Sequence, residues 1–104
     1  MTYREELIER ITVDEFCKRY GVEVVVRERA HVPEGTVGRY YAYLNRTEIE
    51  DRGMLISPFS DGVTITEALS GIPVLYSNHN LSVDAHTDEP QCAGPFVFVP
   101  EEPK

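Results

Sequence analysis

The chain has 104 residues, which is the length of one small domain. Its 41% hydrophobic and 27% charged residues are typical of a globular protein and exclude a disordered chain. No segment approaches the ~18 consecutive apolar residues that a membrane helix needs, and the charged N-terminal segment argues against a secretory signal peptide. We expect a single domain over residues 1–100 and a frayed acidic tail over 101–104.

The charge is strongly negative and unevenly distributed. Ten Lys and Arg stand against 18 Asp and Glu, a formal net charge of −8, and residues 61–104 carry −6 of it. Because a nucleic-acid interface needs a concentrated basic surface, we expect no nucleic-acid partner, and equally no membrane partner. The acidic half either keeps the domain in solution or binds a basic protein, with Asp84, Asp88 and Glu89 as contacts.

The two cysteines, Cys17 and Cys92, lie far apart and lack the regular spacing of small disulfide-rich secreted domains. They predict two buried thiols in a reducing compartment. Together with the absence of an export signal, this indicates a cytoplasmic protein.

Apolar residues at helical spacing predict two short N-terminal helices, or one helix kinked at Thr12. Thr12 and Glu15 form a predicted capping box before the second segment, and Gly21 is expected to end it. The first helical face contains Tyr3, Leu7, Ile8 and Ile11, and the second contains Val13, Phe16, Cys17 and Tyr20.

The rest of the chain reads mainly as short strands. Thr64 and Glu67 form a second predicted capping box, for a helix that Gly71 and Pro73 would end, although Asp61-Gly62 could instead turn a hairpin. Asn45 is expected to cap a helical turn through Glu48 that ends at Gly53. Strands are predicted over residues 22–30, 38–44, 54–56, 74–76 and 96–99, the first two antiparallel and the last at an edge. The predicted fold class is α+β, with N-terminal helices packed on a mostly antiparallel four- or five-stranded sheet.

One polar segment could bind a divalent metal. Asp84, His86 and Asp88 alternate in sequence, so an extended segment would direct all three side chains to one face, and His79 could add a nitrogen ligand. A solvent-exposed polar loop explains the same residues without a metal. No other cofactor is expected, because the common nucleotide-binding and nucleophile motifs are missing from the sequence.

A tyrosine-rich strand flanked by arginines is the second candidate site. Tyr41 and Tyr43 fall on one face of the predicted strand 38–44, near Arg39 and Arg46, and Tyr and Arg are enriched at protein-binding hot spots. The alternative is a sheet covered on both faces, since strands favour aromatic residues in any case.

These patterns lead to three hypotheses about function. The first is a non-enzymatic protein-interaction or accessory domain that forms a homodimer through the strand Arg39–Leu44 or the strand Phe96–Val99. The second is a small metal-dependent enzyme or metal-binding protein that uses the Asp84–Asp88 segment. The third is an acidic inhibitor or decoy that binds a basic protein.

Overall fold

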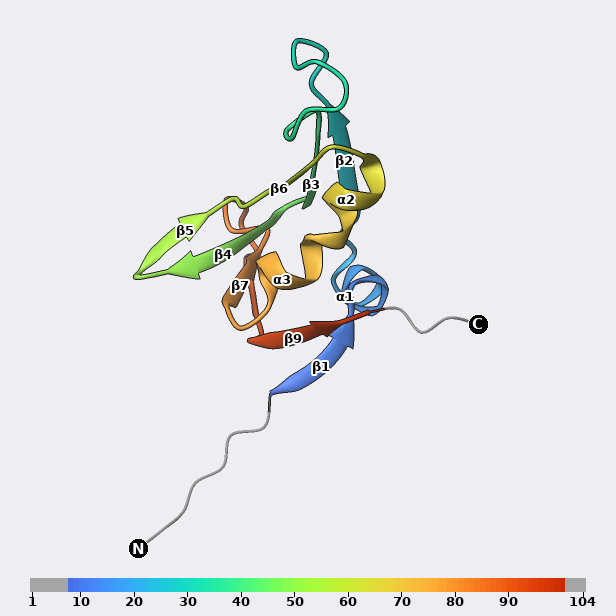
Figure 1. Cartoon of the computed structure of the whole chain (residues 1–104). Coiled ribbons are helices and arrows are strands. Elements are labelled where there is room, and N and C mark those ends of the chain that lie inside the picture. The colour runs from blue at the N-terminus through green and yellow to red at the C-terminus, as the bar shows by residue number, and fades with distance from the viewer. Residues whose placement is uncertain (1–7, 101–104) are drawn as a thin grey trace, which may run out of the picture.

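The computed structural model describes residues 8–100 (Figure 1). Within them the chain forms three short helices and nine strands, and the strands make up three small sheets. The predicted α+β class is confirmed. The predicted antiparallel sheet of four or five strands matches only in part: a four-stranded antiparallel sheet is present, but the predicted strands are divided among sheets of two, three and four strands. The predicted frayed tail, 101–104, and Tyr3 and Leu7 of the predicted first helix lie outside the described residues.

The N-terminal region contains a strand where the spacing predicted a helix. β1 (Glu9–Thr12) runs parallel to β9 (Phe96–Val99), with Ile11 opposite Phe98. The distant partner strand buries Ile11 and so outweighs its local helical periodicity. α1 (Val13–Tyr20) begins as predicted, because the Thr12 hydroxyl accepts a hydrogen bond from the Glu15 amide at 3.1 Å. It ends as predicted at Gly21, whose φ of 67° lies in the left-handed region.

The three-stranded sheet has β3 at its centre. Its members are β2 (Val24–Glu28), β3 (Tyr40–Leu44) and β6 (Ser60–Gly62), in the order β2-β3-β6. Both pairings are antiparallel, which confirms the predicted arrangement of the first two strands. Since β3 has a neighbour on each side, it offers no free edge for the dimer pairing expected from the sequence.

The four-stranded sheet replaces the helical turn predicted after Asn45. Its members are β4 (Thr47–Asp51), β5 (Met54–Ile56), β7 (Asn80–Val83) and β8 (Gln91–Ala93), in the order β5-β4-β7-β8. Arg52 and Gly53, with φ of 52° and 80°, form the two-residue turn between β4 and β5. The predicted strand 54–56 is confirmed, whereas β7 and β8 were not predicted. The β4–β5 hairpin projects from the body of the domain (Figure 1).

Two consecutive helices follow β6. Thr64 caps α2 (Ile65–Ser70) by accepting a hydrogen bond from the Glu67 amide at 3.1 Å, as predicted. The strand predicted over 74–76 is wrong, because α3 (Ile72–Tyr76) occupies these residues. Pro73 lies in the first turn of α3, where its missing N–H leaves no hydrogen bond unmade, and it therefore starts a helix instead of ending one.

The core lies where α1, α3 and β9 meet. Phe16 is 0% exposed, and its ring meets Phe96 and Phe98 edge-on, with centroids 5.9 and 5.4 Å away. Tyr76 is also fully buried, and its hydroxyl accepts a hydrogen bond from the Leu44 amide at 2.9 Å. This bond ties α3 to the end of β3.

The cysteines differ from the prediction of two buried thiols. Cys17 on α1 is half-buried, whereas Cys92 on β8 is exposed. Within residues 8–100, no helix has the length and apolar character that a membrane crossing requires.

Candidate protein-binding surface

The outer face of β3 carries two stacked tyrosines. Ala42 and Leu44 point inward and are buried, so the alternation of the strand places Tyr41 and Tyr43 on the opposite face. Their rings stack with centroids 6.1 Å apart and an interplanar angle of 21°. Ala68 of α2 is buried in the same core as Ala42, so the helix covers the inner face of β3 and leaves the tyrosine face outside.

Arg29 fixes an aromatic pair beside these tyrosines. Its guanidinium carbon lies 4.1 Å from the ring centroid of Tyr41 and 5.5 Å from that of Phe59. The rings of Tyr41 and Phe59 meet edge-on at 5.9 Å. The Arg29 Nη1 atom also donates to an Asp61 carboxylate oxygen at 2.7 Å and to the Gly38 carbonyl at 2.8 Å. The Arg29 cation lies near both rings, and two hydrogen bonds from Nη1 hold it in place, so this group is preorganised.

Arg27 extends the surface along β2. Its Nε donates a hydrogen bond to the Tyr43 hydroxyl at 3.1 Å, and this hydrogen bond raises the pKa of the guanidinium, which stays charged at every physiological pH. We call Arg27, Arg29, Tyr41, Tyr43 and Phe59 the aromatic–arginine face. Phe59 is 49% exposed and is its most accessible ring.

Arg39, a predicted binding residue, has a structural role. Its Nη1 atom donates to the Val32 carbonyl at 2.8 Å, and its Nη2 atom lies 2.8 Å from the Glu28 carboxylate. The side chain is only 14% exposed. Arg39 therefore holds the loop between β2 and β3 and does not belong to the aromatic–arginine face.

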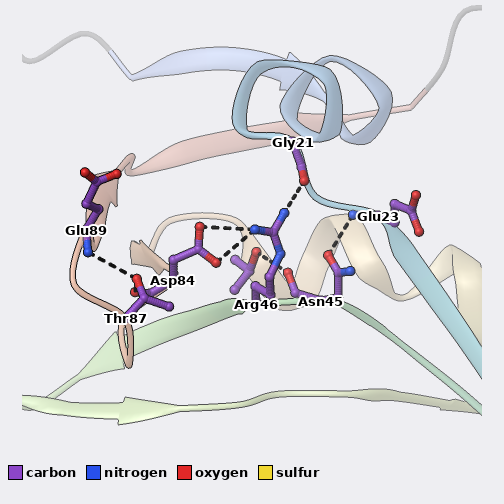
Figure 2. Close-up of polar contacts among 8 residues, drawn as sticks. Gly21, Glu23, Asn45, Arg46, Asp84, Thr87 and Glu89 are labelled. Carbon is purple, nitrogen blue, oxygen red and sulfur yellow. Dashed lines mark hydrogen bonds and ion pairs between the residues drawn. The ribbon is translucent and has the colours of Figure 1, made fainter.

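Arg46, the other predicted arginine, joins three distant segments (Figure 2). Its guanidinium pairs with both carboxylate oxygens of Asp84, at 3.0 and 3.2 Å, and also donates to the Gly21 carbonyl at the end of α1. Next to it, the Asn45 side chain accepts a hydrogen bond from the Glu23 amide at 2.8 Å. The turn between β3 and β4 is thus tied to α1, β2 and the segment after β7.

The predicted metal-binding segment is not extended. β7 ends at Val83, and Asp84 has a φ of 58° at the start of a turn that the Thr87 amide closes by donating to the Asp84 carbonyl. Asp84 pairs with Arg46, and His86 lies 2.7 Å from the Glu48 carboxylate. The part of the chain that the structure describes contains no group of three His, Cys, Asp or Glu side chains arranged to hold a metal ion. The one-face arrangement of Asp84, His86 and Asp88 is therefore not formed, and His79 joins no such group either.

Two of the cavities in the described part of the chain lie beside β2, β3 or α3. A cavity of about 260 Å³ borders the aromatic–arginine face between Tyr43, Glu48 and Phe59. A larger one of about 510 Å³ lies between α1, β2 and α3, with walls that include Val22, Ile72 and Val99. The larger cavity is almost wholly apolar, with carboxylates only from Asp14 and Glu23, so its lining suits apolar contact and lacks the convergent polar groups typical of an active site.

The sequence identified two of the five residues of the aromatic–arginine face. The predicted pairing of residues 22–30 with 38–44 could have placed Arg27 opposite Tyr41, as it is in the structure. Phe59 had no such signal, because it reaches Tyr41 only through the pairing of β6 with β3. No protein-family model, curated protein or solved structure matches this chain.

Proposed function

We propose that the chain is a non-enzymatic protein-interaction domain that forms a homodimer through the aromatic–arginine face. The observation that carries this proposal is the exposed Phe59 ring, held with Arg29 and Tyr41 in one preorganised group. Tyr and Arg dominate hot spots, and rigid groups lose little entropy on binding.

A second copy of the chain is the partner that this face suits best. In an isologous dimer the same patch meets itself, so it has to supply both members of each contact. The aromatic–arginine face contains cations and the aromatic rings that accept them. Arg27 also places positive charge at this surface of an acidic protein, and Arg29 balances the charge of Asp61, which reduces repulsion between two copies of charge −8 at this surface.

The dimer would use faces and not strand edges. β3 lies between β2 and β6, and β9 lies between β1 and the residues after α3, where the Asn78 amide donates to the Phe96 carbonyl at 2.8 Å. The two strands that the sequence suggested for pairing across a two-fold axis are therefore both occupied.

Light scattering at micromolar concentration tests the proposal. We expect a dimer for the native chain, and about 30-fold weaker association for Phe59→Ser, since a hot-spot side chain contributes about 2 kcal/mol. Val74→Ser is the matched control, because Val74 is 81% exposed on α3 and lies outside the face. A native chain that remains monomeric, or equal association of the two variants, would contradict the proposal.

The hypothesis of an acidic inhibitor that binds a basic protein stays a prediction, with fewer of the predicted contact residues available. Asp84 is 17% exposed and already paired with Arg46, so it is not available to a basic partner. Asp88 and Glu89 are exposed.

A further inference from the structure

β5 is an edge strand with unusually apolar and exposed side chains. Within residues 8–100 it pairs only with β4, at the outer side of the projecting hairpin (Figure 1). Met54, Leu55 and Ile56 are 68%, 43% and 40% exposed. Unpaired backbone groups can accept another strand, so proteins usually protect such edges with Lys, Pro or a bulge. β5 contains no Lys and no Pro.

The turn determines which backbone groups face outward. In a hairpin with a two-residue turn, the residues flanking the turn, here Asp51 and Met54, form a hydrogen-bonded pair. The next pair, Glu50 and Leu55, is then a non-hydrogen-bonded pair. The N–H and C=O of Leu55 are therefore directed away from β4, toward the free edge.

The two faces of this edge differ in chemistry. Ile56 lies opposite Ile49 and Met54 lies opposite Asp51, so one face is mainly apolar and carries the Asp51 carboxylate next to the turn. Leu55 lies opposite Glu50, so the other face presents an exposed carboxylate. None of the ion pairs within residues 8–100 involves Glu50. An added strand would therefore meet Met54 and Ile56 on a mainly apolar face, with Asp51 only at the turn end, and Leu55 beside the unneutralised Glu50 on the other.

We propose that the free edge of β5 binds an extended segment of another protein in which Lys or Arg alternates with apolar residues. The alternation of a strand would direct the basic side chains toward Glu50 and the apolar ones toward Met54 and Ile56. Charge complementarity selects this occupant over a second copy, because pairing two β5 strands would bring two acidic hairpins together. This binding surface is separate from the aromatic–arginine face and goes beyond the proposed dimer.

A short peptide of alternating Lys and Val, labelled for fluorescence anisotropy, is the probe. We expect it to bind the full chain, to bind more weakly at high salt, and to bind about threefold more weakly to Glu50→Gln. A peptide in which Glu replaces Lys is the control and should not bind. Equal binding of the two peptides would overturn the proposed occupant.

Two variants at Leu55 test the backbone contact. Leu55→Pro removes the outward N–H while leaving the pairing with β4 intact, and Leu55→Thr keeps it. We expect about tenfold or greater loss of peptide binding for Leu55→Pro relative to Leu55→Thr. Equal affinity of these variants would overturn the proposal.

If Leu55→Pro does not fold, hydrogen exchange of the native chain tests the same contact. Bound peptide should slow hydrogen exchange of the Leu55 amide, and an unchanged exchange rate would contradict the added strand. Failure of the dimer is a separate result: Phe59→Ser should weaken self-association and leave peptide binding unchanged. If Leu55→Pro abolishes the dimer, a second copy occupies β5 and the proposed occupant is wrong.

Discussion

Replacing Phe16 by Ala is expected to lower the free energy of unfolding by about 3–5 kcal/mol. The side chain is 0% exposed, and its ring contacts Tyr20, Phe96 and Phe98, with centroid distances of 4.7, 5.9 and 5.4 Å. The substitution removes the buried ring and leaves a cavity that these neighbours cannot fill completely. Since domains of this size are stable by about 5–15 kcal/mol in total, this substitution removes a large share of the free energy of unfolding.

Urea denaturation measures this effect, and Phe59→Ala is the control. Both variants remove the same side chain, but Phe59 is 49% exposed, so its loss should cost far less stability. If the two variants lose equal stability, the placement of Phe16 at the centre of the core is wrong.

Tyr76→Phe is expected to cost about 1–3 kcal/mol at neutral pH. The Tyr76 hydroxyl accepts a hydrogen bond from the Leu44 amide at 2.9 Å, and the variant leaves this buried N–H without an acceptor. The hydroxyl also contacts the Pro58 carbonyl at 3.4 Å, just before Phe59. The same variant should therefore loosen the segment that holds Phe59 and weaken the dimer.

The contribution of Tyr76 should fall in alkaline solution. Burial raises the pKa of Tyr76 to about 12, whereas an unfolded chain ionises its tyrosines near 10. The contribution is thus fully present below about pH 10 and decreases by about 1.4 kcal/mol per pH unit as the pH rises toward 12, because the unfolded state loses its proton first.

Urea denaturation of the native chain and Tyr76→Phe at about pH 9 and about pH 11 isolates this contribution, since the other titrating groups are common to both proteins. We expect the difference in stability between them to shrink at the higher pH. A difference that stays constant would show that the hydroxyl is not buried in the folded state.

Local signals in the sequence predicted the elements whose cause is local. The caps at Thr12 and Thr64 and the left-handed end at Gly21 depend on neighbouring residues alone, and all three are present. β1, β7 and β8 were missed because each depends on a strand that lies far away or was itself unrecognised. β4 was missed although its adjacent partner β5 was predicted, because Asn45 was interpreted as the cap of a helical turn. β1 is the clearest case: its partner β9 begins 87 residues further along the chain, with Glu9 opposite Phe96.

The candidate site could be predicted only in part for a related reason. Strand alternation was enough to place Tyr41 and Tyr43 on one face. The sequence could not show that Arg39 donates a hydrogen bond to the Val32 carbonyl or that Arg46 donates one to the Gly21 carbonyl. Both contacts depend on how distant loops fold back onto these side chains. Arg29, which was not predicted, is the arginine that reaches Tyr41.

The most direct test of the homodimer through the aromatic–arginine face is an amide NMR spectrum recorded over a dilution series of the native chain. We predict that the signals of Tyr41, Tyr43 and Phe59 shift together as the concentration falls, while that of Val74 on α3 stays in place. Spectra that are identical at every concentration, or shifts that centre on another part of the surface, would contradict the proposed interaction site.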